Sequence, residues 1–554
     1  MSRIFRVLSA RARSERGFTM VMAVMVLLAS AIITYAAMDA VAQDAGGVRN
    51  SLDQNRSLDA ADAGLAAFRQ QLSANPQYWS LCPTVTSATV PASTDAGSTE
   101  SYSYHVLPAT TAPSNDNRCD TANPTGTVIE GNNIASGSFR VEISGTSGKA
   151  TRSIVAQFRP PSFLNYVYYT DYEMLDPLIN SSGCNSWLTS NYSVANPPYY
   201  WTAISGGIAG PTRIANCGDI QFVTNDVING PLHSNDYLDI CGSPVFGRSG
   251  ESPPDAIETP GTYSDSGCAN AATYNTASGA PNTNAGSLTR PSTAAALQTV
   301  ADGNNASLTN GCSATAGCVF TGPTWITLNG STVTVQNAAY NSGTATTLTA
   351  GYPHNGVIYV QNGSGTCSPY SNTSPDYPTS GDPCGDATVS ETTGSNYTAS
   401  LTIASANDVI VASSLTTAMD SNHEPANNDF LGLIANDFVR IAHPCGSGGN
   451  TTSGGYSSLT SPYVDAAILA VNHSFIVDNF GCGASLGTLH IDGALAQAFR
   501  GAVGTGGGQG GVSSGYLKDY EYDGALLSES PPYFLAPTSS TWLLVREAEC
   551  DTTC

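Results

Sequence analysis

Two glycine-rich patterns near the C-terminus have the form of catalytic or nucleotide-binding motifs. Gly511–Gly515 fits the nucleophile pattern G-x-S-x-G, and Gly506–Gly511 fits the dinucleotide pattern G-x-G-x-x-G. Both chemistries require a strand before the motif and a helix after it, because the turn presents the serine or the phosphate-binding amides. Here a glycine run precedes the serine and no helical periodicity follows it. A chain with 55 glycines produces such matches by composition, so we predict no catalytic residue and no nucleotide cofactor.

Aspartates recur in a more regular setting. Asp226, Asp236, Asp408 and Asp437 each follow an asparagine after a short apolar segment. If these copies stack, the carboxylates align along one edge and could bind calcium, as in some β-helix polysaccharide lyases. The simpler interpretation is that Asn-Asp forms the turn, since both residues hydrogen-bond their own backbone. From the sequence we expect no basic residue beside them that could act as a lyase base.

Histidines and cysteines show no metal-ligand spacing. The seven histidines are dispersed, His473 lies at a turn of the repeat, and His443 and Cys445 stand alone as a pair of ligand types. The 14 cysteines include no C-x-x-C, so we predict no metal site and favour disulfides in an oxidising compartment. The connectivity stays open. Sequence neighbours give three candidate pairs: Cys312 with Cys318, Cys367 with Cys384, and Cys550 with Cys554.

The charge balance excludes one class of partner. Of 554 residues only 11% are charged, the formal net charge is −23, and the only lysines are Lys149 and Lys518. An acidic surface of this kind repels phosphate, so we predict no nucleic-acid partner.

One long apolar stretch determines where the chain resides. Phe18–Met38 contains 21 residues without a charge, and five arginines precede it. A helix of this length spans a bilayer, and the arginines orient it with residues 1–17 in the cytoplasm. The alternative is a secretory signal peptide cut after Ala42. Apolar residues keep helical spacing as far as Leu72, which predicts one helix over 18–75 and which a signal peptide does not need.

The residues around Gly17 resemble a known leader. Arg16-Gly17-Phe18-Thr19 followed by an apolar helix resembles the class III leader of type IV pilins and pseudopilins, and "RSLDAADAGLAAFRQQL" is similar to the helix of PilX-type minor pilins. The resemblance implies that a prepilin peptidase cuts between Gly17 and Phe18 and that the new N-terminus is methylated. It also implies that the helix stays in the cytoplasmic membrane until it packs against other pilin subunits in a filament.

The chain departs from this family at one position. Major pilins carry glutamate at the fifth mature position, where it is thought to pair with the N-terminal amine of a neighbouring subunit. Here that position is Met22. The departure favours a minor or tip subunit over the bulk subunit of a filament.

Two β regions are predicted after the helix. Residues 76–100 are predicted to be loop. Alternating strands at 101–107, 138–144 and 152–158, the last two joined by a hairpin at "GTSG", predict a small antiparallel pilin-like sheet over 76–160. Residues 161–540 contain five copies of a strand–turn–strand pattern, beginning at Gln221, Pro231, Ile403, Leu433 and Leu469. Such copies favour a parallel β-helix, with a β-sandwich as the alternative, and 541–554 form a tail.

The expected architecture is therefore an α+β pilin-like unit, with a long helix and a small antiparallel sheet, followed by a mainly-β solenoid. The expected function is that of an exported minor or tip subunit of a type IV pilus or pseudopilus, displayed for adhesion to an unidentified surface ligand. We expect no enzymatic activity. Two alternatives stay open: a carbohydrate-active β-helix enzyme on a pilin-like anchor, and a Sec-secreted surface β-helix protein.

Overall fold

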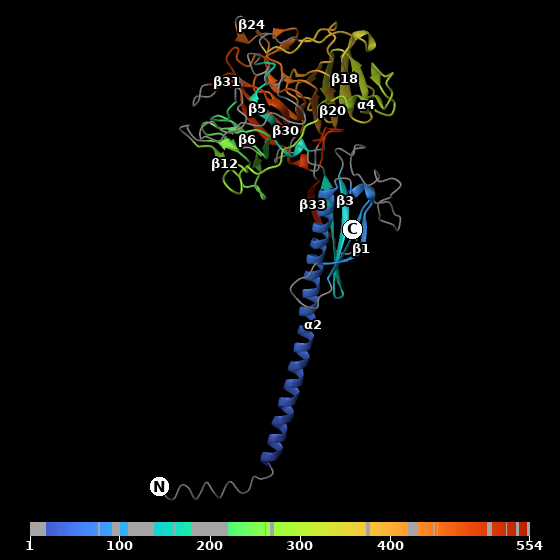
Figure 1. Cartoon of the computed structure of the whole chain (residues 1–554), viewed down its shortest axis with the longest axis vertical. Coiled ribbons are helices and arrows are strands. Elements are labelled where there is room, and N and C mark those ends of the chain that lie inside the picture. The colour runs from blue at the N-terminus through green and yellow to red at the C-terminus, as the bar shows by residue number, and fades with distance from the viewer. Residues whose placement is uncertain are drawn as a thin grey trace. The chain divides into compact units, whose positions relative to one another are not determined.

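The chain folds into two compact units, which are described separately. The first contains residues 1–127, 139–158 and 546–554, and the second contains 128–138 and 159–545 (Figure 1). The computed structural model describes residues 18–75, 78–90, 100–108, 138–159, 162–179, 220–260, 262–265, 271–372, 377–418, 429–446, 449–450, 452–506, 512–527, 529–538 and 542–550.

The first unit consists of one long helix and one five-stranded sheet. Helix α2 (Phe18–Ala74) is followed by the short 3-10 helix η1 (Tyr78–Leu81). The sheet has the order β1 (Thr84–Thr89), β2 (Ser101–Val106), β3 (Phe139–Ser147), β4 (Ala150–Arg159) and β33 (Leu543–Cys550).

The C-terminal half of α2 packs against this sheet. Ala61, Leu65, Phe68 and Leu72 are spaced three or four residues apart, so they share one face of the helix, and all are buried. A β-carbon on Gly145 of β3 would lie 2.0 Å from the Ser57 carbonyl oxygen. Glycine at this position therefore lets the helix and the sheet approach backbone to backbone.

The sheet contains two strands that the sequence did not reveal. The hairpin between β3 and β4 turns at Gly148-Lys149, where Gly148 has a φ of +57°, as "GTSG" predicts. The prediction of loop over 76–100 is wrong, because β1 lies there. Its residues are exposed or half-buried, so it lacks the apolar alternation that marks a strand. The segment described above as a tail contains β33, which places Glu549 in an ion pair with Arg152.

The second unit is built mainly from parallel strands. Its larger sheet has 15 strands in the described residues. Along the main path the order is β12 (Thr273–Tyr274), β9 (Val245–Phe246), β6 (Val227–Asn229), β32 (Val512–Tyr522), β30 (Ser485–Arg500), β28 (Tyr463–Ala470), β22 (Leu431–Ala435), β20 (Leu401–Ser405), β18 (Val357–Gln361), β14 (Cys318–Thr321) and β13 (Gly311–Cys312). Off this path lie β5 (Tyr168–Leu175), β7 (Leu232–Ser234), β10 (Ile257–Glu258) and β31 (Gly504–Gly506).

Residues in register across the larger sheet form a continuous apolar column. Each member is at most 2% exposed, and successive members occupy neighbouring parallel strands. The column consists of Cys318, Ile358, Ile403, Leu433, Ile468, Leu495, Tyr168, Leu232 and Ile257. Each of these side chains is buried only when the neighbouring strands are in place, so successive strands stabilise one another.

A second sheet contributes to the same core. It has seven described strands in the order β17 (Thr346–Thr347), β16 (Thr332–Asn337), β15 (Thr324–Asn329), β19 (Ala387–Glu391), β21 (Val409–Val411), β23 (Val439–Ile441) and β29 (Phe475–Val477). From β15 to β29 the pairing is parallel. Val389, Val411, Ile441 and Val477 are in register, fully buried, and part of one hydrophobic cluster with the larger sheet.

Short elements complete the second unit. They are α4 (Ala296–Asp302), the 3-10 helices η3 (Phe163–Asn165), η4 (Asn341–Gly343) and η5 (Gly524–Leu527), and the two-stranded pairs β8 (Leu238–Asp239) with β11 (Tyr263–Ser264), β24 (Cys445–Gly446) with β25 (Gly449–Asn450), and β26 (Thr452–Ser453) with β27 (Tyr456–Ser457).

Three of the five repeat copies, those beginning at Ile403, Leu433 and Leu469, connect the two sheets through equivalent turns. β20 leads through Asn407-Asp408 into β21, β22 through Asn436-Asp437 into β23, and β28 through Asn472-His473 into β29. Side-chain carboxylates join one copy to the next, since Asp408 accepts a hydrogen bond from the Phe438 amide at 3.0 Å. Asp386 accepts one from the Asp408 amide at 3.1 Å in the same way. Asp408 thus satisfies a backbone donor of the following copy, and Asp386 satisfies the amide of Asp408 itself.

Candidate functional sites

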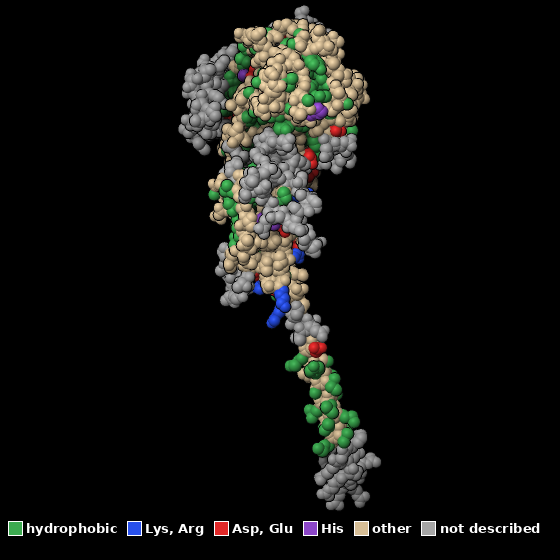
Figure 2. Space-filling model, turned by 90° about the vertical axis from the view of Figure 1, so that its right-hand side faces the viewer, with side chains coloured by type: hydrophobic (Ala, Val, Ile, Leu, Met, Phe, Trp, Pro, Cys, Tyr) green, Lys and Arg blue, Asp and Glu red, His purple; other side chains and the backbone are tan. Residues whose placement is uncertain are grey.

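The N-terminal part of α2 is an exposed apolar surface. Met20–Asp39 is long and apolar enough to cross a membrane, with a mean hydropathy of 2.3, and none of it is buried. Figure 2 shows hydrophobic side chains gathered along this part of the helix. Because contiguous exposed apolar surface is unfavourable in water, this segment requires a bilayer or a protein partner.

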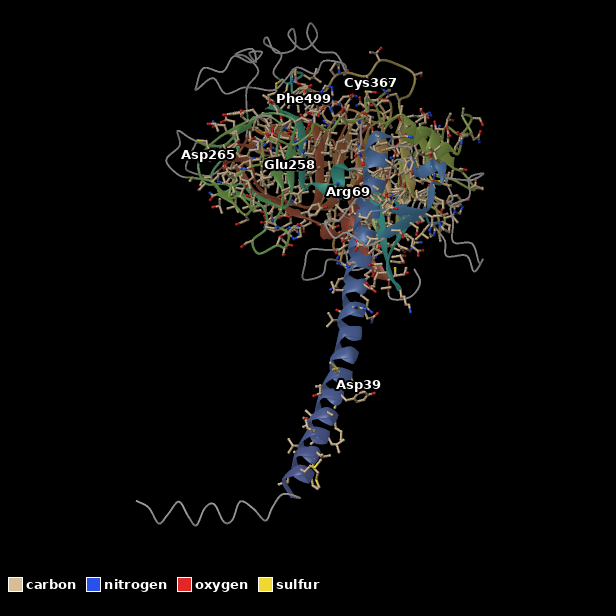
Figure 3. The ribbon with its side chains drawn as sticks, turned by 60° about the horizontal axis from the view of Figure 1, so that its bottom comes forward. Asp39, Arg69, Glu258, Asp265, Cys367 and Phe499 are labelled. Carbon is tan, nitrogen blue, oxygen red and sulfur yellow. A yellow bond between two sulfur atoms is a disulfide. The ribbon has the colours of Figure 1, made fainter. Side chains whose placement is uncertain are left out.

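The polar side chains of this segment are compatible with an apolar environment. Ser30 Oγ donates to the Leu27 carbonyl oxygen at 2.9 Å, and Thr34 Oγ1 donates to the Ser30 carbonyl oxygen at 2.7 Å. Hydroxyls bonded to their own helix need no water, which is the condition that a hydrocarbon surrounding imposes. Asp39 is the first charged residue after Arg16 and ends the apolar stretch (Figure 3).

The predicted processing and assembly residues lie at the start of this helix. Gly17 falls outside the described residues, and Phe18 is the first residue of α2. Met22 lies within the helix and is 54% exposed. Between Phe18 and Met38 the helix carries no carboxylate.

The described cysteines are mostly oxidised. Disulfides join Cys312 to Cys318 and Cys445 to Cys482. Further disulfide-bonded residues are Cys82, Cys241 and Cys550, while Cys554 falls outside the described residues. The Cys445–Cys482 bond spans 37 residues, and its cysteines follow the parallel neighbours β23 and β29, so sequence proximity could not indicate it.

Cys367 and Cys384 remain thiols in the structure, although they are a predicted pair. Cys384 is buried and hydrogen-bonds with Cys367; burial, followed by that hydrogen bond, raises the pKa of its thiol. A protonated, buried thiol reacts slowly, so formation of the predicted bond requires an oxidant and access to Cys367, which Figure 3 labels.

A buried ionic network lies beside these thiols. Arg440 is 2% exposed and pairs with Asp408 at 3.0 Å and Asp478 at 3.5 Å, with its guanidinium 4.8 Å from the centre of the Tyr370 ring. It lines a cleft with about 470 Å³ of empty space, together with Asp386 and Asp408. Burial raises the pKa of Asp408 to about 7, against the opposing effect of Arg440.

The sequence contained a signal for this network. Arg440 is in register with Ile410 in the preceding copy and Ile476 in the following copy. A cation where both flanking copies have isoleucine indicates a buried charge that needs carboxylate partners.

The turn aspartates do not converge on a common centre. The expectation that no basic residue lies beside them is wrong for two of them, because strand register brings Arg440 to Asp408 and Lys518 to Asp226. Asp236 accepts hydrogen bonds from the Glu173 and Tyr237 amides. Asp437 accepts a hydrogen bond from Asn436. Within the described residues, no three histidine, cysteine or acidic side chains are grouped so as to hold a metal ion.

A second group of carboxylates surrounds a small cavity. Asp429, Asp465, Asp492 and Asp523 line a space of about 210 Å³. Asp465 is 4% exposed; its Oδ2 accepts from the Thr417 amide at 2.8 Å, while its Oδ1 has no hydrogen-bond partner. Burial raises the pKa of Asp465 to about 8, and the nearby carboxylates add to this effect.

This carboxyl predicts a pH-dependent stability. Because the pKa of Asp465 is raised from 3.8 to about 8, the folded state binds more protons than the unfolded state within that range, and its contribution to stability falls as pH rises. Asn cannot ionise, so Asp465→Asn should become more stable relative to wild type by up to about 1.4 kcal/mol per pH unit. Thermal unfolding of the full chain in detergent between pH 5 and pH 8 measures this difference.

The control is Thr398→Ala, which changes an exposed side chain and removes no ionisable group. Its difference from wild type should stay nearly constant between pH 5 and pH 8. A constant difference for Asp465→Asn as well would contradict the assignment of a neutral buried acid.

Comparison with known proteins gives little similarity. No family model matches the chain, and no curated protein matches it in sequence. One weak structural neighbour is a pilin. It is the competence-associated pilin ComZ from Thermus thermophilus, with 11% identity and a TM-score of 0.29 over 90% of this chain and 97% of that chain. Similarity at this level does not establish a common fold.

Proposed function

We propose that this chain is an exported, non-enzymatic subunit that is anchored by Phe18–Met38 and enters a type IV pilus or pseudopilus as a minor or tip component. The observation that carries the proposal is the wholly exposed, uncharged first part of α2, placed directly after the Arg16-Gly17 leader. The same helix continues without interruption into the part that packs on the sheet of the first unit.

A helix divided in this way has two environments. The C-terminal half is held by its own sheet through Phe68, which contacts the rings of Phe158 and Tyr104 at 5.4 and 5.3 Å between centroids. Residues 20–39 of the helix are not packed against the sheet, and in a filament the equivalent helices of other subunits would pack against them. An apolar helix without charges suits two surroundings: the membrane before assembly and the core of a filament after it.

We further infer that the second unit is a parallel β-helix that serves as the displayed body. Strands in parallel register on two sheets, the apolar column through the larger sheet, and the equivalent Asn-Asp turns support this inference. The net acidity of the chain favours contact with uncharged or cationic surface ligands over nucleic acid.

The proposal is tested by retention and co-assembly. The tagged full chain is produced in a host with a complete pilus system, filaments are sheared off, and both membranes and filaments are probed for the tag. We expect the chain in membranes and, at low copy number, in filaments. Ile33→Lys places a charge within the apolar segment, at a cost of about 2.5–3.5 kcal/mol, and should reduce membrane retention.

The matched control is Gln71→Lys, which adds the same charge to an exposed position on the packed half of α2. It should leave retention unchanged. Recovery of the wild-type chain as a soluble protein in the medium, with neither membrane nor filament association, would contradict the proposed function.

A further inference from the structure

Lys518 and Asp226 form a close, secluded amine–carboxylate pair in the second unit. Lys518 Nζ lies 3.0 Å from Asp226 Oδ1 and 2.9 Å from Oδ2. The lysine side chain is 13% exposed and the aspartate side chain 2%. They directly precede Asp519 and Val227, which are in register on the parallel strands β32 and β6. The two side chains are therefore presented side by side from neighbouring backbones that are 292 residues apart in sequence.

The use of lysine here is exceptional within the unit. Lys518 is the only lysine in residues 159–545. Apart from histidines, the other cationic side chains that pair with carboxylates in the described part of the second unit are arginines. These are Arg248 with Asp255, Arg290 with Asp171, Arg440 with Asp408, and Arg500 with Glu173. A guanidinium stays charged and cannot act as a nucleophile, while a lysine amine can lose its proton and attack a carbonyl carbon. Lys518 therefore places a potential nucleophile directly beside a carboxyl group.

The surroundings favour the neutral, nucleophilic form of the lysine amine. Burial lowers the pKa of Lys518, and the nearby Arg500 guanidinium lowers it further, against the opposing effect of Asp226. The Val223 amide donates to Asp226 Oδ2 at 3.0 Å, so it polarises the carboxyl group and would stabilise negative charge on that oxygen. Both residues also line a cleft with about 590 Å³ of empty space, through which a released water molecule can leave.

We propose that Lys518 and Asp226 condense into an intramolecular isopeptide bond. A proton passes from Lys518 Nζ to Asp226 Oδ1, giving a neutral amine and a neutral acid. The amine then attacks Cγ, the charge that develops on Oδ2 is held by the Val223 amide, and Oδ1 leaves as water after accepting a second proton from nitrogen. The Nζ–Cγ bond forms, the Cγ–Oδ1 bond breaks, and the ammonium and carboxylate are converted to one amide and one water. No cofactor or oxidant is needed.

Such a bond would join two distant parts of the second unit permanently. It would tie β32, near the end of the chain, to the loop that precedes β6, and so close a loop of nearly 300 residues. Unlike the disulfides, this cross-link would resist reduction. The inference does not depend on the proposed pilus function, because it concerns only groups within the second unit.

Tryptic digestion of the reduced and alkylated wild-type chain tests the proposal. Trypsin cannot cleave after an acylated lysine, so the cross-link predicts one branched peptide in which residues 214–248 are joined to residues 501–546. Its mass should be that of the two peptides less one water, and tandem mass spectrometry should place the link at Asp226 and Lys518. Cleavage after Lys149, which is exposed in the hairpin of the first unit, serves as the control within the same digest.

The variants separate a covalent bond from an ion pair. Lys518→Arg keeps the charge and Asp226→Ala removes the carboxyl group, and either should give separate linear peptides with no loss of water. If the wild-type digest instead contains peptides 501–518 and 519–546, the pair is only an ion pair and the proposal is wrong. This result is independent of whether either variant folds.

Discussion

The mature chain is expected to begin at Phe18. In the proposed function the arginines before Gly17 would keep residues 1–17 in the cytoplasm, and α2 starts at Phe18, so the Gly17–Phe18 bond would lie where the proposed anchor begins. Glycine before the cut suits a peptidase site, because the absence of a side chain lets the backbone approach the catalytic groups closely. Gly17→Leu should therefore leave nearly all of the chain uncleaved when it is co-expressed with a prepilin peptidase.

N-terminal sequencing and intact mass of the membrane-extracted protein measure this outcome. Arg16→Lys is the control, since it keeps the charge of the leader and should be cleaved as the wild type is. A mature chain that begins at Gln43 would show signal-peptidase cleavage after Ala42 and would contradict the pilin-like interpretation of the leader. Because that cleavage would remove the apolar segment, it would also leave the chain without its proposed anchor.

Local patterns in the sequence were sufficient to predict the elements that depend on near neighbours. The apolar spacing that ends at Leu72 corresponds to a helix that ends at Ala74, and "GTSG" corresponds to the hairpin of β3 and β4. The Asn-Asp pairs lie between consecutive strands, as at Asn407-Asp408. Each of these features is fixed by interactions within a few residues, so a single sequence carries the signal.

Features that depend on contacts between strands far apart in the sequence could not be predicted from local patterns. Strand β1 has little buried surface, and β33 joins the first sheet from the far end of the chain. The partner of a buried charge is likewise set by register between strands. Arg440 meets Asp408 and Asp478 from neighbouring copies, 32 and 38 residues away. The types of these residues could be noted in the sequence, but their pairing follows only from the order in which the strands stack.

The chain is also expected not to assemble into long filaments on its own. This applies when it is expressed with an export and assembly machinery but without any other pilin. In a filament core the N-terminal amine of Phe18 would be removed from water. An isolated buried charge costs several kcal/mol or more unless it is paired. Met22 offers no carboxylate, and the first charged residue after Phe18 is Asp39, five to six helical turns along α2. A homopolymer would therefore bury one unpaired amine in each subunit.

Met22→Glu tests this cause directly. The substitution supplies a carboxylate at the fifth mature position, so we expect the variant to enter filaments formed with other pilins in greater number than the wild type. Met22→Leu is the matched control, because it keeps an apolar side chain of similar volume and should behave as the wild type does.

Electron microscopy of cells that express the wild-type chain alone gives the complementary result. Long homopolymers there would contradict the minor-subunit role, since they would show that another contact neutralises the amine, whereas labelled copies confined to filament ends or to the membrane would support it.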